Sequence, residues 1–346
     1  MHRVTGIVLA IGAVSFPLAP AQAEQSGWLS AGLTYTRDLA AQTTLMRGAT
    51  GSELLSRGGF ETGAGVNWSS IDQDGGVSAT AQGAFDKGFK ADTDIADLGL
   101  SGAWMRAISE RWLFRAEAST ALYRNEAFRG SGYDRVGVAT TFGYFASNAS
   151  GLDLTLALFG ENHDQDADAR YRNNRFQAEM IYYLPHDKGG SRWNISAALQ
   201  RNDASVSQFQ YSSLLFGAAW TNWTLGSFTG SASAQWRQDD YDGGGMQPVY
   251  IDGGSPQGSP MGMRPSEPLQ DFPGMTSPQQ RNDTLAWLSL GLSRSINARW
   301  SASLSLNAGY YESEPMTSQR WFSDYALILE RRFYPPVSGS ARGKRQ

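Results

Sequence analysis

The stretch LSLGLSRSINARWSASLSLNAGY, which runs from Leu288 to Tyr310, alternates apolar with small polar residues on both sides of a short break. Leucine takes every second position before the break, and a second alternating run begins at Trp300. A period of two sends successive side chains to opposite faces of an extended chain, which predicts two β-strands. The intervening segment Ser295–Arg299 has room only for a turn, so the two strands are predicted to pair in antiparallel fashion.

The turn of this hairpin occurs twice in the chain. RAISERW, from Arg106 to Trp112, returns as RSINARW, from Arg294 to Trp300. Both copies join alternating runs, and both lead into a strand that begins with tryptophan. We expect the two turns to solve the same structural problem at the same end of one sheet.

Alternation with a period of two continues along nearly the whole chain after residue 24. We count about 14 strands of roughly 10 to 12 residues, and strand counts of about 12 to 16 stay open because strand boundaries are the softest part of such a prediction. The apolar faces span residues 29–35, 60–68, 77–85, 98–104, 112–122, 136–144, 152–158, 176–182, 193–199, 214–220, 228–236, 288–292, 300–310 and 325–333. The opposite faces carry small and polar residues with a few charges, so one face of the predicted sheet is polar.

The beginning of the chain has the composition of a secretory signal. Arg3 precedes an apolar run from Val4 to Leu18, and Ala21-Gln22-Ala23 is a small-x-small cleavage site. The apolar run is shorter than the roughly 20 residues that a membrane-spanning helix needs, which disfavours an N-terminal anchor. We therefore expect residues 1–23 to be a signal peptide and the mature chain to start near Glu24.

The overall composition excludes several classes of protein. Cysteine is absent from the 346 residues, which excludes a lipid-anchored cysteine, a disulfide framework and thiolate metal sites. Without Arg3 the chain keeps 28 basic and 33 acidic residues, and this mild acidic excess argues against a nucleic-acid partner. No apolar run of about 18 residues follows the signal, so the sequence predicts no transmembrane helix.

The lengths of the connections distinguish a membrane barrel from a soluble β-sandwich, whose strands alternate too. Long charged connections, such as residues 123–134 and 235–283, take turns with short ones, such as residues 107–111 and 295–299. Outer-membrane barrels have long extracellular loops and short periplasmic turns. We therefore predict an all-β, transmembrane, antiparallel up-and-down β-barrel over residues 24–333, with both RAISERW-type turns on the periplasmic side.

Tryptophan placement supports the same interpretation. Indole is amphipathic and prefers the headgroup level of a bilayer, so a barrel should carry tryptophan at its strand ends. The residues that we expect in the periplasmic interface girdle are Trp68, Trp104, Trp112, Trp193, Trp220 and Trp300. Two other tryptophans, Trp28 and Trp287, fall out of phase with the apolar faces of their strands.

Two segments lack a sustained period. Residues 240–281 hold seven of the thirteen prolines and a run of three glycines, which predicts a long extracellular loop. This loop is either an exposed surface loop or one that folds inward and narrows a pore, and the sequence leaves both open. Residues 334–346 contain Pro335-Pro336 and a basic end, and we interpret them as a periplasmic tail.

The segment Tyr325-Ala326-Leu327-Ile328-Leu329-Glu330-Arg331-Arg332-Phe333, together with the signal and the alternating strands, resembles the bacterial outer-membrane β-barrel superfamily. In that superfamily a last strand that ends in an aromatic residue is read by the barrel-assembly machinery. The resemblance implies that Tyr325 and Phe333 belong to this assembly signal. The segment Gly32–Asp38 is also similar to the first strand of the barrel domain of surface-lipoprotein assembly modifiers.

An inventory of reactive residues gives no catalytic or metal site. After the signal the only histidines are His163, followed by Asp164-Gln165 in a predicted loop, and His186, followed by Asp187-Lys188 in a predicted turn. The acidic run that begins at Asp164 starts like a calcium loop but has Ala169 and Arg175 where that loop requires glycine and glutamate. We expect no enzymatic activity, no cofactor and no metal site.

The charges on the polar faces are the remaining functional lead. Charged groups are costly to bury unless they are solvated or paired, so they imply water or salt bridges inside the barrel. The predicted lumen-lining residues, which would also set selectivity, are Glu61, Asp97, Arg115, Glu117, Arg135, Asp153 and Glu179. We expect a passive or weakly selective porin-like pore for small hydrophilic solutes in the outer membrane, in contact with lipid and lipopolysaccharide. The alternative is a non-conducting structural, assembly or surface-protein translocation barrel.

Overall fold

A computed structural model describes residues 24–37, 57–72, 74–90, 93–125, 132–146, 150–164, 170–186, 190–205, 210–242, 282–314 and 318–333. These residues form fourteen strands: β1 (Glu24–Arg37), β2 (Arg57–Asp72), β3 (Gly75–Gly88), β4 (Ile95–Ala107), β5 (Trp112–Asn125), β6 (Gly132–Phe145), β7 (Gly151–Asp164), β8 (Arg170–Pro185), β9 (Arg192–Ala204), β10 (Tyr211–Leu225), β11 (Phe228–Tyr241), β12 (Asn282–Ser295), β13 (Trp300–Glu314) and β14 (Ser318–Phe333). The predicted strand number is confirmed. The predicted signal peptide, residues 1–23, and the predicted tail, residues 334–346, lie outside the described residues.

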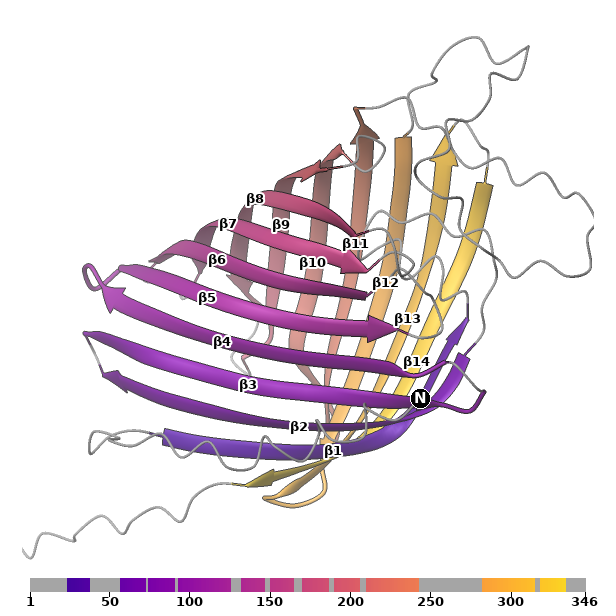
Figure 1. The fold of residues 1–346 in the computed structure, drawn as a ribbon. Coiled ribbons are helices and arrows are strands. Elements are labelled where there is room, and N and C mark those ends of the chain that lie inside the picture. Colours follow the sequence, from indigo (N-terminus) through magenta and orange to yellow (C-terminus); the bar gives the residue numbers. More distant parts are fainter. Residues whose placement is uncertain are drawn as a thin grey trace, which may run out of the picture.

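The fourteen strands close into one antiparallel barrel, in which each strand pairs with its neighbour in sequence and β14 returns to β1. The closing register runs from Gly27 opposite Phe333 to Arg37 opposite Ser323. In Figure 1, β2 to β7 form the near wall and β9 to β13 the far wall. Closure leaves no unpaired strand edge, so the backbone groups of the wall are satisfied without water. The predicted up-and-down barrel is therefore confirmed.

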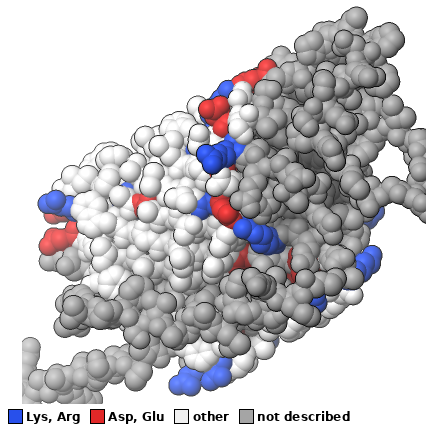
Figure 2. Space-filling model, in the orientation of Figure 1, with Lys and Arg blue, Asp and Glu red and all other residues white. Residues whose placement is uncertain are grey.

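Every strand of the barrel has one row of residues that faces inward and one that faces outward. The outward rows hold large apolar side chains that are between 45% and 65% exposed, among them Leu29, Leu33, Val136, Leu156, Leu199, Leu288 and Leu327. Every acidic or basic residue in these rows lies within four residues of a strand end. Figure 2 shows the result on one face, where charged side chains gather toward the strand ends and leave a pale band between them. A band without charge is what a surface in contact with hydrocarbon requires.

The strands are longer than the sequence indicates, because they have 13 to 16 residues. Crossing hydrocarbon takes only about 9 to 11 tilted residues, so the strand ends extend beyond the apolar band. The extra residues are polar and break the alternation, which is why the sequence places them in loops. The predicted loop 240–281 is thus shorter at its start, since β11 continues through Tyr241, and residues 243–281 lie outside the described residues.

The two copies of the repeated turn have the same hydrogen bonds. The Ile108 N–H donates to the Trp112 carbonyl at 2.8 Å, and the Ile296 N–H donates to the Trp300 carbonyl at 2.9 Å. The residue after each isoleucine caps the turn with its side chain, because Ser109 Oγ accepts from the Arg111 N–H at 3.3 Å and Asn297 Oδ1 accepts from the Arg299 N–H at 2.9 Å. The repeated sequence therefore encodes one turn used twice, as predicted.

Both repeated turns lie at the barrel end that also carries Glu24 and Phe333. The two shortest connections, β2–β3 and β10–β11 with two residues each, also lie at this short-turn end, whereas the three-residue β13–β14 connection lies at the opposite end. The opposite end carries the two long gaps, residues 38–56 and 242–281. Within the described part of the chain, no helix is long and apolar enough to cross a membrane.

Candidate functional site: the inner wall

Burial identifies the inner wall of the barrel. The buried apolar residues all belong to the inward rows, and they are Ala103, Ala157, Ala198, Ala204, Tyr211, Tyr241, Leu285, Tyr311 and Phe322. By backbone register the inward rows also contain the acidic residues Glu24, Glu61, Asp86, Asp97, Glu117, Asp153, Glu161, Glu179, Asp239, Asp283, Asp324 and Glu330. The basic residues of these rows are Arg57, Arg115, Arg135, Arg175, Arg192, Arg237, Arg320 and Arg332. The register places all seven predicted lumen residues among these two sets.

Two of the predicted residues neutralise each other. Arg115 and Glu117 are two positions apart on β5, so both face inward, and their charged groups are 2.5 Å apart. The pair is partly exposed, with 46% and 31% of the two side chains accessible. An exposed pair of this kind contributes little stability, and its main effect is to cancel two charges on the wall.

Arg135 belongs to a buried cluster on β6, β7 and β8 that the sequence did not predict. Its Nε donates to Glu161 Oε1 at 2.6 Å, and Arg175 forms a second ion pair with the same oxygen. The ring of Phe159 lies 5.5 Å from the Arg135 guanidinium and 5.8 Å from that of Arg175. Glu161 lies beyond the predicted apolar face 152–158, but β7 continues to Asp164 and only 2% of the Glu161 side chain is exposed.

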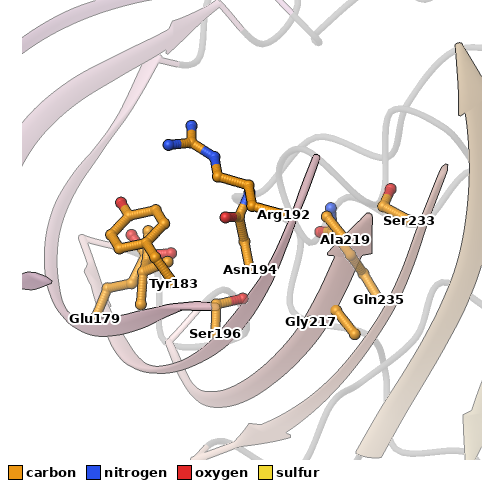
Figure 3. A pocket seen from close by; sticks show the side chains of 11 residues that line it. Glu179, Tyr183, Arg192, Asn194, Ser196, Gly217, Ala219, Ser233 and Gln235 are labelled. Atoms are coloured by element: carbon orange, nitrogen blue, oxygen red, sulfur yellow. The ribbon is translucent and has the colours of Figure 1, made fainter. Parts of the chain in front are cut away.

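Asp153 and Glu179 lie on the neighbouring strands β7 and β8, and Figure 3 shows Glu179 beside Tyr183. The Tyr183 hydroxyl donates to Asp153 Oδ2 at 2.7 Å, and the Arg192 guanidinium lies 5.3 Å from the centre of the Tyr183 ring. A cavity of about 260 Å³ opens here between β8, β9, β10 and β11. Its polar lining comes from Glu179, Tyr183, Arg192, Asn194, Ser196, Ser233 and Gln235. The cavity therefore presents both hydrogen-bond donors and acceptors.

Glu61 and Asp97 lie on the wall formed by β2 to β4. Glu61 is in register with Asp86, whose carboxylate accepts a hydrogen bond from Arg57 at 2.6 Å and from the Thr34 hydroxyl at 2.7 Å. Arg57 therefore forms its ion pair with Asp86, and Glu61 has no ion pair among the described residues. Asp97 is exposed and in register with Tyr123.

A second buried cluster lies on β10 and β11 near the end opposite the short turns. Arg237 Nε donates to Asp239 Oδ1 at 2.6 Å, and the Ser213 hydroxyl donates to the same oxygen at 2.5 Å. The Arg237 guanidinium also lies 5.3 Å from the centre of the Tyr211 ring, and Tyr211 contacts Tyr241. The cluster could not be predicted, because Asp239 and Tyr241 lie beyond residue 236, where the apolar alternation ends.

Just beyond β11, Asp242 is tied to the outward row of β9. Arg201 donates one guanidinium nitrogen to Asp242 Oδ1 at 2.8 Å and forms an ion pair with the other carboxylate oxygen. These hydrogen bonds hold the pKa of the Asp242 carboxyl below its ordinary value. Both side chains are about two-fifths exposed, so the pair positions the chain where it leaves β11 and adds little stability.

The six tryptophans predicted for the girdle lie in outward rows near the short-turn end. Trp193 stacks on Trp220 with ring centres 5.9 Å apart, and Trp220 contacts Trp223 at 5.6 Å. A β-bulge between Thr221 and Trp223, with Asn222 at a φ of 59°, inserts one residue here. With strict alternation along β10 Trp223 would face inward, so the bulge places both indoles on the outer surface.

Trp28 faces inward, which explains why it is out of phase with the apolar residues of β1. Its ring lies against Gly63 and Gly65 on β2, and a Cβ at Gly65 would be 2.5 Å from Trp28 Nε1. The two glycines make room for an indole on the inner wall. Trp287 is also inward, in register with Gly309 on β13, so it is not part of a girdle.

The predicted assembly residues lie on the outward row of β14. Phe333 ends the strand, is 40% exposed and has the Arg331 guanidinium 4.9 Å from its ring centre. Tyr325 contacts Tyr35 across the seam between β1 and β14, with ring centres 6.2 Å apart. Both positions are accessible from outside the barrel.

The two histidines, His163 and His186, belong to opposite ends of the barrel wall by their backbone positions. His186 follows β8 and packs edge-on against Trp220, with ring centres 5.7 Å apart. His163 lies on β7 by its backbone, opposite Tyr133 and Tyr171, and not in the loop that the sequence predicted. Among the described residues, no group of three or more histidine or carboxylate side chains is arranged to hold a metal ion.

Comparison with known proteins finds similarity in structure alone. No protein-family model matches the chain, and no curated protein is significantly similar in sequence. The chain is similar to an anion-selective porin from Comamonas acidovorans, with 10% identity, a TM-score of 0.40 and coverage of 90% of this chain and 99% of that one. It is also similar to the outer membrane protein OprD from Pseudomonas aeruginosa (8% identity, TM-score 0.40, 91% and 94% coverage). A bacterial polysaccharide outer membrane secretin gives 10% identity, a TM-score of 0.42 and 90% and 98% coverage. At identities and TM-scores this low, the solutes and mechanisms of those proteins do not transfer to this chain.

Proposed function

We propose that the protein is an outer-membrane pore through which small hydrophilic solutes pass passively. One observation carries the proposal: the outward rows are free of charge between the strand ends, whereas the inward rows hold twelve acidic and eight basic residues. An apolar outer surface is compatible with contact to lipid, and a charged inner surface is compatible with a water-filled lumen. The protein then needs no covalent chemistry, and we assign it no enzymatic activity.

The size of the barrel supports the same proposal. An eight-stranded barrel is about as wide as side chains alone can fill, so a barrel of fourteen strands encloses additional space. Some parts of the inward rows also carry small side chains, since Ser301, Ser303 and Ser305 are successive inward residues of β13. The lumen residues named above would then select among solutes by the width of the pore and by the electrostatic field of their charges.

Some features favour the alternative, a non-conducting structural, assembly or surface-protein translocation barrel. Asp283 and Leu285 on β12 are fully buried, and Tyr241 is 1% exposed, although all three belong to the inward rows. Part of the inner wall is therefore covered. A pore must pass beside this covered region, whereas a plugged barrel would not conduct.

Single-channel recording in a planar lipid bilayer tests the proposal. The mature chain, refolded in detergent and checked for heat-modifiable migration on a gel, should give stepwise currents in potassium chloride. A folded barrel that inserts into the bilayer without any current would refute the pore and favour the alternative.

The surroundings of the barrel belong to the same proposal. The outward rows would contact outer-membrane lipid and, at the end opposite the short turns, lipopolysaccharide. Tyr325 and Phe333 would be read by the barrel-assembly machinery. Substitution of Phe333 by alanine should lower the amount of folded protein in the outer membrane while the purified chain still refolds in detergent.

A further inference from the structure

The inner wall carries more negative than positive charge. Its rows hold twelve carboxylates and eight guanidinium groups, whereas the whole chain is close to balanced. Most of the guanidinium groups are already paired. Arg57 binds Asp86, Arg237 binds Asp239, and Arg332 binds Glu330. The excess charge therefore resides on carboxylates that no arginine neutralises.

Four of these carboxylates make no ion pair within the described part of the chain: Glu61, Asp97, Asp153 and Glu179. They lie on β2, β4, β7 and β8, so they are spread around the wall and do not form one cluster. Asp97 is exposed, and Glu179 lines the cavity in Figure 3. Asp153 accepts a hydrogen bond from Tyr183, which is neutral and leaves the carboxylate charge in place.

The inward arginines that carry surplus positive charge are fewer than these carboxylates, and several of them are buried or packed against aromatic rings. Arg135 and Arg175 share Glu161, which leaves a surplus of one positive charge in a cluster whose side chains are 24%, 12% and 2% exposed. Arg192 lies against the Tyr183 ring. Arg320 on the inward row of β14 adds a third positive charge, and three surplus positive charges do not cancel four carboxylates.

We propose that the pore prefers small cations to small anions, which rests on the proposed function as a pore. A wall of low dielectric focuses the field of its charges into the lumen. At about 10 Å in water, one carboxylate enriches a monovalent cation about twofold and depletes an anion by the same factor. The four carboxylates act together, so the effect should exceed that of any single one, and salt near 1 M should suppress it.

The reversal potential across a gradient of potassium chloride measures this preference. Wild-type protein at low salt should give a permeability ratio of potassium to chloride above about two. A variant with Glu61→Gln, Asp97→Asn, Asp153→Asn and Glu179→Gln should bring the ratio close to one or reverse it. Glu110→Gln is the matched control, because it removes one exposed carboxylate from the β4–β5 turn outside the lumen, and it should leave the ratio unchanged.

The outcomes separate the inference from the function on which it rests. Currents with a ratio at or below one in the wild type would overturn the cation preference and leave the pore intact. The absence of current from a folded, inserted barrel would overturn both. Because four substitutions could impair folding, the pairs Glu61→Gln with Asp97→Asn and Asp153→Asn with Glu179→Gln are recorded separately. Each pair should lower the ratio below that of the wild type, and a ratio equal to the wild-type value in both pairs also overturns the inference.

Discussion

An arginine placed on the outward row of β7 should destabilise the barrel far more than an arginine placed one residue away on the inward row. Leu156 is 51% exposed in the outward row, in register with Thr140 and Ala178, and lies near the middle of its strand. The neighbouring residue Thr155 faces inward, directly opposite Glu179. The substitutions Leu156→Arg and Thr155→Arg therefore add the same group at nearly the same depth, on opposite faces.

The expected magnitudes differ severalfold. Arginine at the bilayer midplane costs about 2 to 4 kcal/mol on the lipid face of a barrel. Thr155→Arg removes a 2.9 Å hydrogen bond between Thr155 and Thr141, worth about 1 kcal/mol, and part of this is offset by the new neighbour Glu179. The difference in the free energy of unfolding between the two variants should be at least about 1 kcal/mol, with Leu156→Arg the less stable.

Both free energies can be measured by guanidinium titration of the protein folded into phospholipid vesicles, followed by tryptophan fluorescence. Wild-type protein and a conservative Leu156→Ala variant serve as references for packing loss. Equal free energies for the two arginine variants, or a larger cost for Thr155→Arg, would show that the two faces do not meet different solvents and would refute the reasoning.

Substitutions at four further residues test individual parts of the structure by the same titration. Glu161→Gln should lower the free energy of unfolding by about 3 kcal/mol, because two guanidinium groups lose a shared, buried counter-charge. An unchanged free energy of unfolding would mean that the cluster is solvated. Asn297→Ala should lower the free energy of unfolding by about 1 to 2 kcal/mol, because two backbone amides lose their acceptors at 2.9 and 3.0 Å. Ser109→Ala in the other copy should lower it less, because only one hydrogen bond of 3.3 Å is lost. The reverse order would contradict the turn assignment. Asn222→Ala should cost about 1 kcal/mol at a positive φ whereas Asn222→Gly should not, and equal effects would argue against the bulge.

The apolar rows and the number of strands could be predicted because lipid imposes a simple rule on the outer surface. Leucine recurs at every second position of β7 and β12, and no charge interrupts these rows in mid-strand. The predicted lumen residues follow from the same rule, since a residue such as Asp153 that alternates with leucine must face the other way. The repeated turn was recognisable because arginine, isoleucine, arginine and tryptophan recur at the same spacing in both copies.

The strand ends and the packing of the lumen could not be predicted from the pattern. Beyond the hydrocarbon both faces meet water, so Glu161 and Asp239 stand in polar segments that look like loops although their backbones are paired. Their burial depends on partners from other strands, and only the register shows which residues lie opposite. The inward position of Trp28 likewise depends on the glycines of β2, and the outward position of Trp223 depends on the bulge at Asn222.

A nitroxide scan along β13 tests most directly whether the outer surface meets lipid while the inner wall surrounds solvent. The chain has no cysteine, so single cysteines at residues 301 to 308 can be labelled one at a time without removing native thiols. In vesicles, we predict that labels at 302, 304, 306 and 308 are relaxed mainly by oxygen, and that labels at 301, 303, 305 and 307 are relaxed mainly by a water-soluble nickel complex. Equal access of the nickel complex to both sets, with no alternation along the strand, would contradict a lipid-facing outer surface and the pore that depends on it.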